Sequence, residues 1–169
     1  MMPPWTERPV EISNLLNPAF AGVLLRRSVD GYKSEAKSGM PIELVFLIMP
    51  FGLHPSTARR LPSRPATTPL HAWLQREENR DVLVKFDERV RSLAPFTREA
   101  VIFATQRRVL DIDETGLIGP GVETLRGFFK YKNCGEEVKD AVNRCFFVGR
   151  WLALSGTTAT IYSLLGVRP

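Results

Sequence analysis

Cysteine and histidine are scarce in this chain of 169 residues, and their scarcity excludes several classes of site. The two cysteines, Cys134 and Cys145, fall in a segment expected to be helical. They would lie about three helical turns apart there, too far for a disulfide. With only His54 and His71 as further soft ligands, the sequence also lacks the ligand spacing of a zinc site. We therefore expect no disulfide and no metal, which is typical of a reducing compartment.

Long apolar runs are missing as well. The most apolar stretch, Ile42 to Leu53, is interrupted by Pro50 and is too short to span a bilayer core of about 30 Å. The opening residues, MMPPWTERPVEIS, lack the charged start and apolar core of a signal peptide. We therefore expect a cytoplasmic protein without membrane contact, in which residues 42–53 form a buried core element. Any part of this stretch that one small core leaves exposed would favour a binding partner.

The motifs of common enzymes are absent. The sequence has no G-x-x-x-x-G-K-[ST] loop, no G-x-G-x-x-G after a strand, no H-E-x-x-H and no G-x-S-x-G. Neither histidine has a carboxylate and a nucleophile nearby in the sequence. The acidic cluster DIDETG, residues 111–116, begins like a calcium loop, but Val122 occupies the position of the bidentate Glu. We expect a β-hairpin there, and a protein without catalytic residues, cofactor or metal.

Positive charge is in slight excess, with 23 Lys and Arg against 18 Asp and Glu and a net charge of +5. This excess permits contact with nucleic acid or an acidic partner and proves neither. Residues 54–68 are rich in proline and arginine, and we expect them to form a mobile loop. Arg59, Arg60 and Arg64 in this loop are candidate nucleic-acid contacts. The alternative is a plain surface connector containing one helical turn.

Helical periodicity dominates the remaining sequence. Asn17 and Pro18 are typical of a helix start, so a helix is expected from residue 18 to about 36. Pro95 is expected to end an amphipathic helix, and Thr97 to cap the next one. A short helix capped by Thr68-Pro69 is also expected, as is a helix from Gly135 to Leu154. Between them we expect a hairpin, in which Leu110 and Ile112 alternate with acidic residues before a turn at Gly116.

These elements predict a mainly α fold, a compact helical domain over residues 1–169 with one small β-hairpin. Because a hairpin follows a helix, residues 69–119 also permit a winged-helix-like unit. A helical domain with an incidental hairpin is the alternative. A pair of helices over residues 135–169 completes the chain.

The closing stretch GRWLALSGTTATIYSLLGVRP has the outline of a helix-turn-helix. Its second helix contains no Arg, Lys, Asn or Gln, so it has almost no means of reading base edges. We therefore expect it to pack or to dock a partner, with Arg150 and Arg168 at its edge. The candidate packing or docking residues are Trp151, Ile161, Tyr162 and Leu165.

Five sequence blocks carry a family resemblance that spans almost the whole chain: ERPVEISNLLNPAFAGVLLRRSVDGY, GMPIELVFLIMPFGLH, TTPLHAWL, FTREAVIFATQ and GRWLALSGTTATIYSLLGVRP. Together they resemble a bacterial family, the middle component of three-component ABC systems. The resemblance implies a non-catalytic subunit that works with an ABC ATPase of the SMC and Rad50 type and with a third protein, in a bacterial conflict or antiphage system. None of the blocks is a catalytic or ligand motif, so no site residue can be transferred.

Two main functions remain open from the sequence, beside a small enzyme or toxin with an unfamiliar site, for which no residue argues. The first is an adaptor that bridges the SMC/Rad50-like ATPase and the third component, with DNA contacted through the complex. The second is a DNA-binding module or regulator of winged-helix type.

Overall fold

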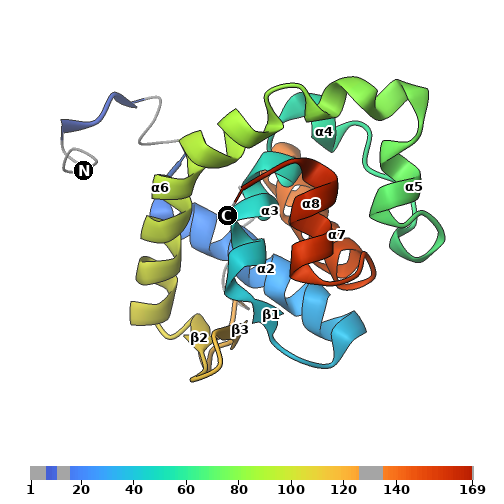
Figure 1. The fold of residues 1–169 in the computed structure, drawn as a ribbon. Coiled ribbons are helices and arrows are strands. Elements are labelled where there is room, and N and C mark those ends of the chain that lie inside the picture. Colours follow the sequence, from blue (N-terminus) through green and yellow to red (C-terminus); the bar gives the residue numbers. More distant parts are fainter. Residues whose placement is uncertain (1–6, 11–15, 126–134, 169) are drawn as a thin grey trace.

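Helices form most of the computed structural model, which describes residues 7–10, 16–125 and 135–168 (Figure 1). A small antiparallel sheet lies at one end, so the mainly α fold class is confirmed. Cys134 lies outside the described residues. The α-helices are α2 (Pro18–Ala36), α3 (Val45–Gly52), α4 (Pro55–Ala58), α5 (Leu70–Leu74), α6 (Phe86–Gln106), α7 (Glu136–Ala153) and α8 (Thr158–Leu165). The 3-10 helices are η2 (Ile42–Leu44), η3 (Pro65–Thr67) and η4 (Glu77–Leu83), and the strands are β1 (Met40–Pro41), β2 (Leu110–Ile112) and β3 (Leu117–Pro120).

Helix α2 begins where the sequence predicted, because Asn17 caps it. The Asn17 Oδ1 accepts a hydrogen bond of 2.8 Å from the backbone N–H of Ala19. The helix ends at Ala36, followed by Lys37 in the left-handed region at φ 60°. The Asn17 side chain therefore fixes the start of α2.

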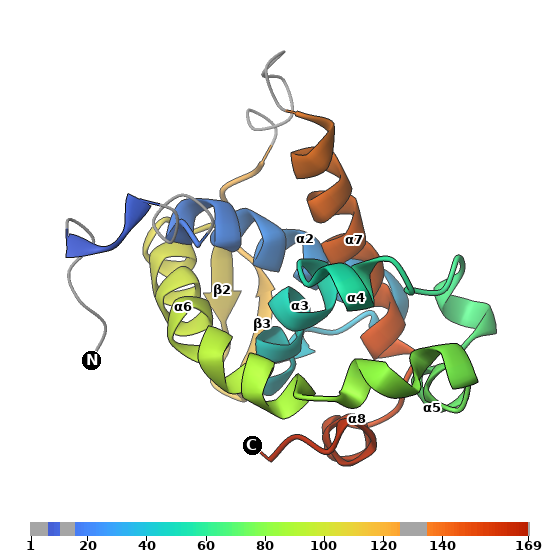
Figure 2. The ribbon, with the colours of Figure 1, turned by 90° about the horizontal axis from the view of Figure 1, so that it is seen from above.

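Helix α3 lies between α6 and α7 in the middle of the molecule (Figure 2). All of its residues except Phe46 are buried, including Pro50, so the expected core element over residues 42–53 is confirmed. The stretch therefore mostly fills the core, and its half-buried apolar side chains are Ile42, Phe46 and Leu53.

The prediction that Pro95 ends a helix is wrong. Helix α6 runs without a break from Phe86 to Gln106, with Pro95 inside it. Thr97 does not cap a new helix, since its hydroxyl donates to the carbonyl of Leu93 at 3.1 Å. An interior proline costs about 3 kcal/mol, but buried side chains on both sides of it favour one continuous helix packed on the core. These buried residues are Phe86, Val90, Ala100, Val101 and Ala104.

The predicted hairpin is present as β2 and β3, and Gly116 in its turn has φ +80°. The Asp113 Oδ1 accepts hydrogen bonds from the N–H groups of Thr115 (2.9 Å) and Leu117 (3.0 Å), so this carboxylate shapes the turn. The sequence missed β1, which pairs with β3 and gives the strand order β1-β3-β2. The winged-helix-like unit over residues 69–119 stays a prediction.

Helices α2 and α7 approach so closely that only glycine fits at their contact. A Cβ on Gly149 would lie 1.9 Å from the carbonyl oxygen of Ser28, and one on Gly31 would lie 2.1 Å from that of Phe146. The backbones themselves are therefore in contact, which leaves no space between these two helices.

Two indoles attach the arginine-rich segment to the core. Trp73 Nε1 donates to the carbonyl of Arg60 at 2.7 Å, and Trp151 Nε1 donates to that of Thr68 at 2.7 Å. The N-cap residue of α5 is Pro69, and no side chain caps this helix, so the predicted cap by Thr68 is wrong. Residues 54–68 contain α4 and η3. The mobility of this segment stays a prediction.

Candidate functional site

The last described segment of the chain is anchored by α8. The Thr157 hydroxyl caps this helix by accepting a hydrogen bond of 3.2 Å from the N–H of Thr160. The four side chains predicted to pack or dock are all buried, with exposed fractions of 0% for Trp151, 0% for Ile161, 7% for Tyr162 and 3% for Leu165. They pack within this chain, so a partner could reach only the surface beside them.

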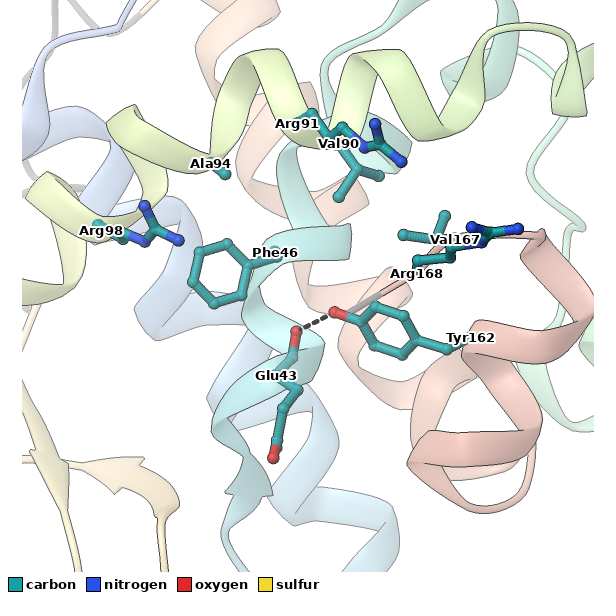
Figure 3. Close-up of a pocket in the computed structure, with 9 residues that line it drawn as sticks. All are labelled: Glu43, Phe46, Val90, Arg91, Ala94, Arg98, Tyr162, Val167 and Arg168. Atoms are coloured by element: carbon teal, nitrogen blue, oxygen red, sulfur yellow. Dashed lines mark hydrogen bonds between the residues drawn. The ribbon is translucent and has the colours of Figure 1, made fainter. Parts of the chain in front are cut away.

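Such a surface exists where α6, α3 and the C-terminal segment meet around Tyr162. The phenol of Tyr162 donates a hydrogen bond of 2.6 Å to the carbonyl of Glu43, which joins α8 to η2. Burial raises the pKa of Tyr162 to about 12, so the phenol remains a donor at neutral pH. Beside it lies a hollow of about 370 Å³, shown in Figure 3. Its lining residues are Glu43, Phe46, Val90, Arg91, Ala94, Arg98, Tyr162, Val167 and Arg168.

Three exposed arginines stand around this hollow. Arg91 and Arg98 lie about two turns apart on α6, and Arg168 comes from the other side (Figure 3). Arg91 forms an ion pair of 2.7 Å with Asp87. The guanidinium of Arg98 lies 5.9 Å from the ring centre of Phe46, a cation–π contact. The site therefore combines an apolar interior with a positive rim.

The three arginines predicted to contact nucleic acid are placed together on residues 59–64, but they differ in exposure. Arg59 and Arg64 are exposed, whereas Arg60 is half-buried and forms an ion pair with Asp81. This pair holds the pKa of Asp81 below its usual value. Arg59 and Arg64 are therefore exposed on a segment whose backbone is held by the indoles of Trp73 and Trp151.

His54 is part of a small polar cluster that the sequence did not reveal. The Ser56 hydroxyl lies 2.8 Å from His54 Nδ1, and Arg89 Nη1 lies 3.2 Å from the same nitrogen. Burial, and then the charge of Arg89, lower the pKa of His54. In a Ser–His–carboxylate triad the carboxylate orients the imidazole from the ring nitrogen opposite the serine, whereas the charged neighbour of His54 is the cation Arg89, which lies nearest the same nitrogen as Ser56. The cluster therefore suits attachment of α4 to α6 better than nucleophilic catalysis.

Neither a metal cluster nor a membrane span is found in the part of the chain that the structure describes. No three His, Cys, Asp or Glu side chains gather there around a common point. No described helix has the length and apolar character needed to cross a membrane. Cys145 is buried, and this burial raises the pKa of its thiol to about 12. The hollow beside Tyr162 is the candidate site because it combines apolar walls with a positive rim.

Comparison with known proteins identifies the family. Residues 5–169 match the model of the ABC-three component (ABC-3C) system Middle Component 3. The chain belongs to this family. The resemblance of the five sequence blocks is therefore confirmed, and the chain is a middle component of a three-component ABC system. No curated protein and no solved structure matches the chain.

Sequence reasoning found only part of the hollow in this middle component. Tyr162 was predicted to pack or dock, and Arg168 to lie at the edge of the C-terminal helices. Phe46, Arg91 and Arg98 were missed, because the first was assigned to a buried stretch and the others follow no motif. The only sequence signal for the two arginines is the helical spacing across Pro95, which places Arg91, Ala94 and Arg98 on one face of a helix.

Proposed function

We propose that this middle component is a non-catalytic adaptor that bridges an SMC/Rad50-like ABC ATPase and the third component of a bacterial antiphage or conflict system. The family match over residues 5–169 carries this proposal, because the family is defined by its place in a system of three components. The adaptor acts in the cytoplasm, and any contact with DNA is made through the complex.

The chain's own chemistry supports a division of labour in which the ATPase handles the nucleotide. The sequence contains no phosphate-binding loop, and the charged neighbour of His54 is an arginine, whereas a Ser–His–carboxylate triad uses an acidic one. Docking on a motor subunit requires surface complementarity instead of reactive groups. The hollow beside Tyr162 supplies such a surface.

Co-expression tests the adaptor proposal. The affinity-tagged chain would be produced with the ATPase and the third component encoded beside it, and the purified material analysed by light scattering after size exclusion. We expect a complex of fixed stoichiometry that contains all three chains. A chain that stays monomeric in the presence of both proteins would contradict the adaptor function.

A second candidate function, DNA binding by a winged-helix-type module or regulator, is favoured by one observation. Arg59 and Arg64 are exposed on a backbone that Trp73 and Trp151 hold in place, as phosphate contacts require. The triple change to Ala at Arg59, Arg60 and Arg64 should weaken DNA binding and lower the salt slope by up to about 3.

A matched control removes the same charge elsewhere. Lys33, Arg107 and Arg108 are also exposed, and their change to Ala should leave DNA affinity within about twofold of the wild type. Fluorescence anisotropy with a labelled duplex at several salt concentrations measures both variants. Equal affinity and equal salt slope in the two triple variants would exclude residues 59–64 as the contact.

A further inference from the structure

The walls of the hollow beside Tyr162 are apolar although they face an open surface. Val90, Tyr162 and Val167 are exposed by only 6%, 7% and 5%, and Phe46 and Ala94 are half-buried. A volume of about 370 Å³ falls within the range of about 300–1,000 Å³ in which proteins hold ligands. Apolar walls of this size suit a large side chain inserted by a partner, the usual form of an interface hot spot.

The charge around the hollow is positive and only partly compensated. Asp87 neutralises Arg91, but no carboxylate forms an ion pair with Arg98 or Arg168 among the described residues. The Glu43 side chain is directed away from the three arginines (Figure 3). An occupant that carries negative charge beside its apolar group would therefore complement both parts of the site.

We propose that this hollow binds an acidic peptide segment of a partner protein. An aromatic or large aliphatic side chain of that segment enters between Phe46 and Tyr162, and its carboxylates pair with Arg98 and Arg168. Arginine suits this role because its planar guanidinium pairs with a carboxylate through two parallel hydrogen bonds.

The apolar walls decide between protein and nucleic acid as the occupant. Nucleic-acid backbones are bound by basic and polar groups that follow the phosphates, and an apolar cavity adds nothing to such contacts. Val90, Ala94 and Val167 offer no side-chain hydrogen bond to a phosphate. A peptide uses both the cavity and the rim.

This inference rests on the proposed adaptor function, because the peptide is taken to belong to the ATPase or to the third component. The test uses the complex of all three chains. In one variant, Arg98→Glu and Arg168→Glu reverse the uncompensated charges. In another, Ala94→Trp fills the cavity without changing any charge. The control, Lys33→Glu with Arg107→Glu, makes the same charge change on exposed residues that do not line the hollow.

We expect each hollow variant to bind the partners at least about tenfold more weakly than the control variant, with the same melting temperature. The charge reversal, but not Ala94→Trp, should also reduce the salt dependence of binding. Folded hollow variants that bind as tightly as the wild type would overturn this inference and leave the adaptor function standing. Failure of the wild-type chain to bind either partner would overturn both.

Photocrosslinking identifies the occupant directly. The photoreactive residue p-benzoylphenylalanine would replace Arg91, which already has Asp87 as its partner, and the complex would be irradiated and digested. A crosslinked partner peptide with Asp or Glu around an aromatic or large aliphatic residue supports the proposal. A crosslink to nucleic acid, or to a basic peptide, overturns it.

Discussion

Helices α2 and α7 meet in one way, and α6 and α8 in another. Between α2 and α7 the backbones touch, and a Cβ on Gly149 would stand 1.9 Å from a carbonyl oxygen. Between α6 and the C-terminal segment a hollow of about 370 Å³ remains, with arginines around it. A contact that excludes even a methyl group contributes to stability. A contact that leaves an apolar hollow with a charged rim is available to a partner.

Substitutions on the buried face of α8, beneath the hollow, should have the largest effect on stability. Ile161 and Leu165 form the buried face of α8, with exposed fractions of 0% and 3%. Changing both to Asp places two carboxylates in the core without partners, which should cost at least about 5 kcal/mol or unfold the C-terminal region. Chemical denaturation followed by tryptophan fluorescence would show the loss. A stable variant that still binds the partners would show that α8 is dispensable.

The tight contact should respond strongly to a single methyl group. Gly149→Ala forces α7 away from Ser28, and we expect a loss of about 3 kcal/mol in the free energy of unfolding. Gly119→Ala is the control, because no atom lies within 4 Å of the added Cβ. Its effect should remain within about 0.5 kcal/mol. Equal denaturation midpoints for the two variants would contradict the backbone contact between α2 and α7.

Arg26 connects α2 to the segments that flank the hairpin. Its Nη1 donates to the carbonyls of Val109 and Glu123 at 2.8 Å each, and its Nε pairs with Asp30 at 2.9 Å. Arg26→Met keeps the length of the side chain and removes these bonds, at an expected cost of about 2 kcal/mol. Hydrogen exchange should become faster over residues 109–123. Unchanged exchange there would mean that the hairpin is held by its strands alone.

Tyr162→Phe removes the bond to Glu43 that closes one side of the hollow, at an expected cost of about 1 kcal/mol. The pKa of Tyr162 is raised from 10.0 to about 12, so the fold favours the neutral phenol. The resulting stability is complete below about pH 10 and is lost as the pH rises to about 12. Cys145 and Tyr32, whose pKa values are also raised, lose stability equally in both proteins. Denaturation between pH 9 and 12 should therefore show a shallower decline in the variant than in the wild type, and parallel curves would contradict this role.

The smallest effect on stability is expected at the hollow itself. Arg98 and Arg168 are exposed and lack ion pairs in the described part of the chain, and Arg98 keeps only its exposed cation–π contact with Phe46, so their change to Glu should alter the free energy of unfolding by less than about 1 kcal/mol. Thermal denaturation checks this expectation. A larger loss would show that these arginines stabilise the fold, which would remove the contrast between the two contacts.

Much of the local structure could be predicted from the sequence because local chemistry determines it. Asn17 marks the start of a helix through a cap and Gly116 marks a turn, and the structure uses both in that way. Pro95 misled the prediction because a local rule gave way to packing on both sides of the proline. The short strand β1 was missed because two residues carry no periodicity.

The site was harder to predict than the fold, since its residues come from three distant parts of the chain. Phe46 lies on α3, Arg98 lies on α6 and Arg168 follows α8. No spacing in the sequence relates these positions, and their meeting depends on how α3, α6 and α8 pack. The family match identified the system but could not indicate the surface.

Hydrogen exchange of the chain, alone and in complex with the ATPase and the third component, tests the central claim most directly. We expect the complex to slow exchange over residues 90–98 and 162–168, around the hollow. The facing turns of α2 and α7, residues 28–31 and 146–150, should show no change because their contact is already closed. A stable complex that slows exchange only elsewhere, such as over residues 54–68, would contradict the account.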